Sequence, residues 1–130
     1  MNFLTPHSDR FLSLLRLMTG LLFLQHGTTK FLHFPVTKYS GVEPLSLIGA
    51  AGMVELVGGI LVTVGLFTRP AAFICSGTMA VAYFMEHLPK GFFPILNWGE
   101  LAALYCFVFL YLAAAGGGRW SIDALRSRAS

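Results

Sequence analysis

Four long apolar segments dominate this chain, and each is close to the length that a helix needs to cross a lipid bilayer, about 20 residues. The segments are residues 11–32, 47–67, 71–88 and 97–115. Charged residues make up only 12% of the chain and apolar residues 55%, against about 25% and about 45–50% in an ordinary soluble domain. The sequence therefore predicts an all-α fold, an integral membrane four-helix bundle in contact with the lipid bilayer.

Short connections join the four segments, which predicts a single domain over residues 1–130. Arg69-Pro70 separates the second segment from the third, because proline cannot continue a preceding helix. Pro89-Lys90-Gly91 ends the third segment, and Asn97 is a natural N-cap for the fourth. The longest connection, residues 33–46, is expected to hold a short surface helix or an extended cap. Segments joined in this way usually pack as neighbours in space.

The basic residues predict which way the protein is inserted. With four spans, both chain termini and the turn near Arg69 lie on the same side of the membrane. That side carries Arg10, Arg69, Arg119, Arg126 and Arg128, and the opposite side carries Lys30, Lys38 and Lys90. Basic residues are more frequent on the cytoplasmic side. We therefore expect both termini in the cytoplasm.

The sequence disfavours nucleic-acid binding and metal binding. The net charge is +3 and the pI about 9.1, but the basic residues form no face interleaved with stacking aromatics, so no nucleic-acid partner is expected. Cys75 and Cys106 each stand alone in apolar sequence. They have neither the spacing of a redox pair nor that of metal ligands, so no metal site is expected.

The ionisable residues inside the segments gather at a similar depth. With a rise of about 1.5 Å per residue, His26 and Glu55 lie about 9 Å and 12 Å from the non-cytoplasmic ends of their segments, and Glu86 and Glu100 roughly 3–5 Å. Charged residues within a membrane are costly and usually pair with one another or face water. We therefore predict one polar cluster, open toward the outer face. Its members are His26, Lys30, Glu55, Glu86, His87 and Glu100.

Helical spacing supports this cluster. A stripe of polar residues and glycines recurs at intervals of three and four from Arg16 through His26 to Lys30. Glu55 shares a face with several glycines, and such small residues let another helix come close. Glu55 is therefore expected in a helix contact rather than in lipid. The residues that align are Gly52, Gly58 and Gly59 with Glu55, and Ser76, Met79 and Tyr83 with Glu86.

Two interpretations of the cluster are open. Histidines and carboxylates held together in a low dielectric can pass protons, and the candidate catalytic residues are His26, Glu55 and Glu100. Other members could hold the oxygen of a quinone or a small anion, and the candidate ligand-binding residues are Arg16, Lys30, Glu86 and His87. Alternatively, these groups satisfy one another and join the helices, with contacts worth about 0.6 kcal/mol each.

Short motifs are spread in order along nearly the whole chain. They are His26-Gly27 followed by Lys30, Met53-Val54-Glu55-Leu56-Val57-Gly58-Gly59, His87-Leu88-Pro89-Lys90-Gly91-Phe92-Phe93, Asn97 with Gly99-Glu100, and Gly118-Arg119-Trp120-Ser121-Ile122-Asp123. Together they resemble the DoxX family of small bacterial membrane proteins. Trp98 departs from the family pattern, in which many members have glycine, and puts a bulky ring near Glu100. The residues that match those shared by the family are Arg16, His26, Lys30, Glu55, His87 and Glu100.

The resemblance implies a four-helix protein of the bacterial inner membrane, linked to redox and thiol-stress physiology, because relatives include a subunit of thiosulfate:quinone oxidoreductase. We therefore expect a quinone-linked oxidoreductase component, or a membrane partner of redox enzymes, with quinone as the candidate cofactor. In this interpretation Glu55 and His26 manage protons, and Lys30 or His87 binds the quinone oxygen or a sulfur oxyanion. Glu100 orients a partner or forms the proton exit.

Other functions fit the same sequence. No nucleotide, flavin or metal motif is present, so a complete enzyme would need a partner chain or a diffusible electron carrier. One alternative is a non-catalytic scaffold or assembly factor, whose buried polar groups specify helix packing. Another is a small-solute transporter, which a chain of 130 residues could form only as a homo-oligomer.

Overall fold

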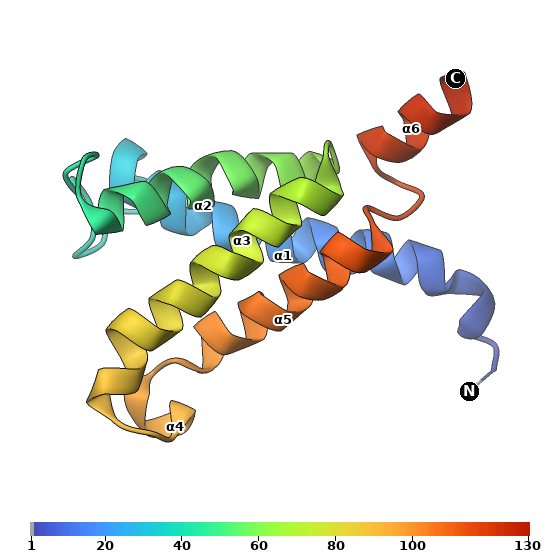
Figure 1. Ribbon diagram of the computed structural model, residues 1–130. Coiled ribbons are helices and arrows are strands. Elements are labelled where there is room, and N and C mark those ends of the chain that lie inside the picture. Colours follow the sequence, from blue (N-terminus) through green and yellow to red (C-terminus); the bar gives the residue numbers. More distant parts are fainter. Residues whose placement is uncertain (1) are drawn as a thin grey trace.

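The computed structural model describes residues 2–130, and the regular structure in this range is helical throughout (Figure 1). The α-helices are α1 (Ser8–Leu32), α2 (Leu47–Val64), α3 (Thr68–Ala82), α4 (Pro94–Asn97), α5 (Glu100–Ala115) and α6 (Ile122–Ala129). A 3₁₀ turn, η1 (Thr5–His7), precedes α1, and α3 continues through a π-helical turn, η2 (Tyr83–His87), and a 3₁₀ turn, η3 (Leu88–Lys90). The predicted all-α class is confirmed.

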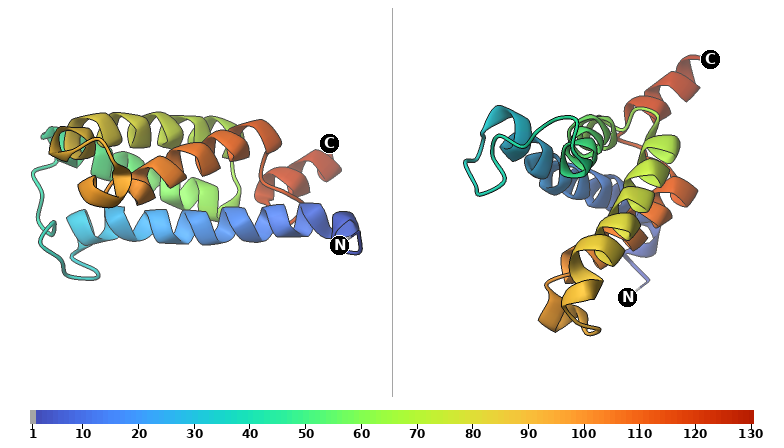
Figure 2. Two further views of the ribbon diagram at one scale, coloured as in Figure 1. Left: turned by 90° about the horizontal axis from the view of Figure 1, so that it is seen from below. Right: turned by 60° about the vertical axis from the view of Figure 1, so that its left-hand side comes forward.

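The long helices form two antiparallel pairs. α1 packs along α2, and α3 packs along α5, whereas α2 lies against α3 over a shorter stretch, and the backbones of α1 and α5 come close at few points. The pairs come together near α6 and diverge toward α4 (Figures 1 and 2). We call the first region the closed end and the second the open end. The predicted four-helix bundle is not confirmed, since the two pairs diverge toward the open end (Figure 1).

Glycines set the close contact between α1 and α2. An added Cβ at Gly27 would stand 2.5 Å from the backbone nitrogen of Leu56, and one at Gly59 would stand 2.7 Å from the Cα of Leu24. No side chain fits at these positions, so the two backbones approach as closely as small-residue interfaces in membranes allow. The same crowding holds at Gly20 and Gly52.

An aromatic core connects the two pairs. The ring of Phe23 on α1 is fully buried, with its centroid 5.5 Å from that of Tyr105 and 4.7 Å from that of Phe109 on α5. Both contacts are edge-to-face, a geometry that aromatic rings prefer. The buried face of α5 therefore consists of positions spaced by three and four residues. These are Ala102, Tyr105, Phe109 and Leu112.

Arg16 fixes the closed end from inside. The residue is only 2% exposed, and its guanidinium donates to backbone carbonyls of two separate segments. Nη1 donates to Val62 at 2.7 Å and to Thr63, while Nε donates to Gly117 at 2.8 Å and Nη2 to Trp120 at 2.9 Å. The last carbonyls of a helix have no partner within the helix and attract cations. Arg16 thus ties the end of α2 to the loop after α5.

Arg69 does the same for the other pair. It lies in the first turn of α3 and donates to carbonyls at the end of α5, those of Ala113, Ala114 and Ala115. Each arginine therefore stands on one helix of a pair and caps the end of its antiparallel neighbour. The closed end is held by charged caps rather than by apolar packing alone.

Several predicted boundaries are corrected. α2 ends at Val64 because Gly65 takes a left-handed φ of +72°, which terminates helices. α3 then begins at Thr68, with Pro70 inside its first turn, where a missing N–H costs nothing. Asn97 does not cap α5, which begins at Glu100 after a left-handed Trp98.

Two helices are long and apolar enough to cross a membrane. They are Leu47–Val64, with a mean hydropathy of 2.0, and Thr68–Lys90, with a mean hydropathy of 1.2. The helix Glu100–Ala115 is apolar but shorter. On all the long helices, large apolar side chains point outward, as in Met18, Ile60, Phe73 and Phe107. Such faces suit contact with lipid.

Candidate functional site

A buried ion pair lies at the contact between α1 and α2. Lys30 Nζ stands 2.5 Å from Glu55 Oε2, and the two side chains are 10% and 7% exposed. The glycines next to both residues allow this approach, since Lys30 itself packs against Gly52. Glu55 therefore faces a helix contact, as its glycine-lined face predicts.

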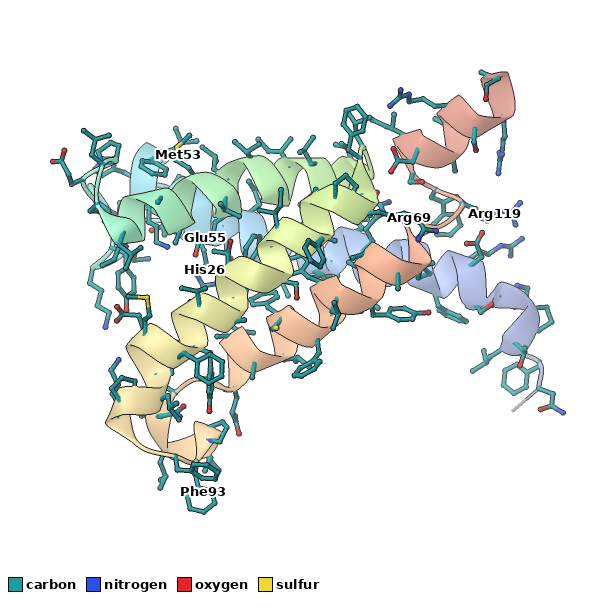
Figure 3. The ribbon with its side chains drawn as sticks, viewed as in Figure 1. His26, Met53, Glu55, Arg69, Phe93 and Arg119 are labelled. Carbon is teal, nitrogen blue, oxygen red and sulfur yellow. The ribbon has the colours of Figure 1, made fainter. Side chains whose placement is uncertain are left out.

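His26 stands beside this pair. Gly27 packs against Leu56, which puts His26 and Glu55 at the same level of the α1–α2 contact. Figure 3 shows both side chains in the angle between the two helix pairs. The ring of His26 is half-buried and meets Tyr105 of α5 edge-to-face, with centroids 6.3 Å apart. We refer to Lys30, Glu55, His26 and Tyr105 as the Lys30–Glu55 site.

Two groups of the Lys30–Glu55 site carry unused hydrogen-bonding capacity. Among the hydrogen bonds of residues 2–130, none uses a ring nitrogen of His26 or the hydroxyl of Tyr105, whereas His87 and Tyr83 are both engaged. An imidazole and a phenol can each donate or accept. The site therefore combines a charge pair with two polar groups that are available to a ligand.

Tyr105 is the member that sequence reasoning missed. It belongs to the buried apolar face of α5, and a tyrosine there looks like core packing. The useful signal is its position: it is the polar-tipped residue on the one face of α5 that turns toward α1.

The π-helical turn explains why Glu86 leaves the predicted cluster. A π turn contains one more residue than an α turn, so the inward position falls one residue later. His87 accordingly turns inward, with Nδ1 3.0 Å from the carbonyl oxygen of Asn97. Glu86 is exposed. The alignment of Glu86 with Tyr83 holds only for an uninterrupted α-helix.

Glu100 also lies outside the Lys30–Glu55 site. It opens α5 and is exposed, because it precedes the first buried residue of that helix, Ala102, by two positions. Two positions correspond to about 200° around a helix, so Glu100 points away from the core. Its place in the first turn remains favourable for a carboxylate because of the helix dipole.

The predicted single cluster is therefore corrected. The structure brings together Lys30, Glu55 and His26, while Glu86, His87 and Glu100 lie at the open end of the α3–α5 pair. Arg16 lies at the closed end, about 21 Å along α1 from Lys30. The two pairs diverge at the open end (Figure 1), so equal depth does not bring these side chains into contact.

Comparison with known proteins agrees with the motifs. The family model described as DoxX matches residues 11–88, a stretch that includes α2, α3 and nearly all of α1. The chain belongs to the DoxX family.

Relatives of this DoxX protein are found in distant bacteria. It is 47% identical to an uncharacterized protein of Haemophilus influenzae, over 95% of this chain and 96% of the relative. It is 33% identical to an uncharacterized membrane protein of Mycobacterium tuberculosis, over 88% and 80%. It is 28% identical to a Bacillus subtilis protein named "Putative oxidoreductase CatD", over 85% and 82%. No solved structure matches it.

A shallow apolar groove of about 230 Å³ runs between α2 and α3 of this DoxX protein. Its lining includes Met53, Val57, Leu61, Ile74 and Cys75 but none of the four residues of the Lys30–Glu55 site. The groove offers no charged group to a ligand. It is therefore suited to an acyl or isoprenoid chain rather than to a polar headgroup.

Proposed function

We propose that this DoxX protein is a membrane component of a redox enzyme system, in which the Lys30–Glu55 site binds a quinone headgroup and exchanges its protons. One observation carries the proposal: His26 and Tyr105 present unused hydrogen-bonding groups beside a buried ion pair. Convergent polar groups in an apolar setting are typical of ligand sites. The printed name of the Bacillus subtilis relative supports the redox assignment.

The residues of the site fit such a headgroup. The carbonyl oxygens of a quinone accept hydrogen bonds, and imidazole and phenol groups can donate them. Phe109 is fully buried and stacks on Tyr105 with ring centroids 5.7 Å apart, which fixes the orientation of the Tyr105 ring. A headgroup oxygen that reaches His26 lies beside the Tyr105 ring as well, because the two rings are in contact.

The protein groups have distinct tasks in this proposal. A bound quinone would supply two-electron chemistry coupled to the uptake or release of protons. His26 carries a proton to or from the headgroup oxygen, and Tyr105 orients that oxygen by a hydrogen bond. Glu55 balances the charge of Lys30 and relays to His26 the proton that the headgroup would take up on reduction. A partner chain supplies the electrons, because this chain carries no nucleotide, flavin or metal motif.

The proposed setting is the bacterial inner membrane, with both termini in the cytoplasm. The closed end holds Arg69, Arg119, Arg126 and Arg128, whereas Lys38 and Lys90 belong to the other end. This bias agrees with the preference of basic residues for the cytoplasmic side. The Lys30–Glu55 site would then open toward the periplasmic half of the membrane.

Paired tyrosine variants test the proposal. Tyr105→Phe removes the hydroxyl of the site, and Tyr111→Phe removes the hydroxyl of an exposed tyrosine on the same helix. Membrane vesicles from a strain that carries each variant are supplied with a reductant, and the rate of quinol formation is followed. We expect His26→Asn to slow the DoxX-dependent rate roughly 100-fold, Tyr105→Phe to slow it less, and Tyr111→Phe to leave it unchanged. Equal rates in all variants would contradict the proposal.

A non-catalytic scaffold is the second candidate, and the ion pair itself favours it. Lys30 and Glu55 satisfy each other at 2.5 Å, as groups that only join helices would do. In that case Glu55→Gln would release a co-purifying partner, while His26→Asn and Tyr105→Phe would leave both the partner and the quinone pool unchanged. The same set of variants thus separates the two functions.

A further inference from the structure

A polar cavity lies at the closed end, far from the Lys30–Glu55 site. It measures about 680 Å³ and lies between the start of α3, the loop after α5 and α6. Its cationic lining residues are Arg69, Arg119 and Arg128. Figure 3 shows both Arg69 and Arg119 at this end of the molecule. We call it the arginine cavity.

The arginines of this cavity have donors to spare. Arg69 uses part of its guanidinium on the last carbonyls of α5, but the group has five N–H donors in all. Arg119 and Arg128 form no hydrogen bond or ion pair through their side chains within residues 2–130, where the Lys30–Glu55 pair is the salt bridge present. The cavity therefore holds cationic charge that no carboxylate of the described residues pairs with.

The carboxylates that line the cavity do not neutralise it. Asp123 accepts the backbone N–H groups of Phe67 and Thr68 at 2.9 Å and 2.8 Å, so its charge is directed at the start of α3. Asp9 lies on the wall formed by α1. Neither approaches a lining arginine closely enough to form a salt bridge in the described chain.

Further donors line the floor. The hydroxyl of Thr68 is fully buried and lies beside the carboxylate of Asp123. It lies next to Gly117, where an added Cβ would stand 2.8 Å from its oxygen. The backbone N–H groups of Gly117 and Gly118 form no backbone hydrogen bonds in the same range. Arginines together with free backbone N–H groups are typical of phosphate sites.

The surroundings identify the source of the phosphate. α2 and α5 end beside the cavity and α3 begins there, so it lies at the level where apolar helices leave the membrane. Phe67 and Trp120 flank this region and are 54% and 56% exposed, as aromatic residues are at membrane interfaces. An apolar rim does not help to bind a phosphate that is free in water, whereas the phosphate of a lipid lies at this depth in a membrane.

We infer that the arginine cavity binds the phosphate of an anionic phospholipid headgroup. Arg119 and Arg128 contact the phosphate, and Arg69 orients it against the loop that contains Gly117 and Gly118. The acyl chains then follow the exposed apolar faces of the neighbouring helices. This site is independent of the proposed redox role of the Lys30–Glu55 site.

Native mass spectrometry of the purified full chain tests the inference, with phosphatidylglycerol and phosphatidylcholine added separately. The double variant Arg119→Gln/Arg128→Gln removes two cations of the cavity, and Lys38→Gln/Lys90→Gln removes two exposed cations at the other end. Wild type is expected to retain phosphatidylglycerol in preference to phosphatidylcholine. Loss of each arginine should weaken binding about fivefold, and loss of both roughly 25-fold. The lysine variant should bind like wild type.

Three results would overturn the inference. The first is unchanged binding in the arginine variant, and the second is an equal loss in the lysine variant. The third is displacement of phosphatidylglycerol by millimolar inorganic phosphate, which would reveal a free-anion site instead. Circular dichroism and the melting temperature verify folding, and both should stay unchanged, because neither arginine side chain makes a hydrogen bond in the described structure.

Discussion

A lysine and a glutamate buried against each other stabilise a protein only while both are present. In Lys30 and Glu55 the charges are almost fully withdrawn from solvent, so each depends on the other to offset its desolvation. Replacing a whole buried pair by apolar residues is often neutral, whereas removing one partner costs about 3–5 kcal/mol. The pair is therefore sensitive to single changes.

Single and double variants should differ accordingly. We expect Glu55→Gln to destabilise the protein by roughly 3–5 kcal/mol, because the buried Lys30 then loses its partner. The double variant Lys30→Met/Glu55→Leu should recover most of that loss. Thermal unfolding in detergent measures both, and a double variant less stable than Glu55→Gln would rule out this account.

Asp123 has a comparable role at the closed end. Partial burial on its own would raise the pKa of this carboxyl group. The backbone N–H and the side-chain hydroxyl of Thr68, the backbone N–H of Phe67 and the nearby Arg126 outweigh that effect and hold the pKa below its ordinary value. The ionised form of Asp123 therefore fastens α6 to the start of α3.

Acid should release this fastening. A carboxyl group with a lowered folded-state pKa contributes stability above its unfolded pKa, about 3.9, and loses it as the pH falls through the folded value. We expect α6 to stay docked from pH 7 to about pH 4 and to detach below it. Trp120 fluorescence in a Trp98→Phe background reports the transition. Asp123→Asn should abolish the pH dependence, and a transition that persists in Asp123→Asn would assign it to another group.

At this scale the sequence allowed a partial prediction of the site. Lys30, Glu55 and His26 were predictable because charged residues on a glycine-lined helix face have few places to go except toward a neighbouring helix. Glu86 was misplaced because one extra residue in a π turn rotates everything after it. Tyr105 was missed because nothing in an apolar helix distinguishes a functional tyrosine from a packing one.

Among the helices, the α1–α2 pair depends on backbone contact. Its glycines admit no Cβ, so any side chain there must push the helices apart. Gly77 of α3 offers a matched control, because an added Cβ would meet nothing within 4 Å. Gly27 of α1 and Gly77 of α3 therefore have opposite roles, although both lie inside helices.

Alanine substitutions should show this difference. Gly27→Ala should destabilise the protein by about 1–3 kcal/mol through overpacking against Leu56. Gly77→Ala should be neutral or stabilise by up to about 1 kcal/mol, since alanine favours the helix more than glycine does. Melting temperatures in one detergent compare the two. A stable Gly27→Ala variant would indicate that the helices separate easily.

Helix positions followed well from the sequence, but helix ends did not. Apolar runs are long and carry a strong signal. The ends depend on single residues, such as the left-handed Gly65 that stops α2 and the left-handed Trp98 that delays α5. A propensity-based interpretation gives Pro70 and Asn97 their usual roles, and here Pro70 enters the first turn while the Asn97 side chain accepts from Gly99.

For the whole molecule, depth was predictable and lateral position was not. Counting residues from a span's end gives height in the membrane, and it correctly groups Lys30, Glu55 and His26. It says nothing about the angle between helix pairs. The α3–α5 pair diverges from the α1–α2 pair (Figure 2). The angle between the pairs depends on which helix faces carry glycines and which carry aromatic rings.

The proposed topology can be checked with new cysteines. Leu45 lies in the loop before α2 and is 94% exposed, and Ser130 ends the chain beyond α6. A membrane-impermeant maleimide should label Leu45→Cys in intact cells and Ser130→Cys only after the membrane is opened. The unsubstituted chain gives the background from Cys75 and Cys106. Labelling of both positions from the same side would refute a four-span arrangement.

Arg16 and Arg69 tie the helix ends together at the closed end. We therefore expect this end to act as a pivot about which the two helix pairs move. α2 has 18 residues and is therefore about 27 Å long, so a tilt of about 10° at the pivot would carry its far tip roughly 5 Å sideways. The α1–α2 pair and the α3–α5 pair would then move apart or together at the open end. A lipid or a protein bound at the closed end would therefore set how far apart the two helix pairs lie at the open end.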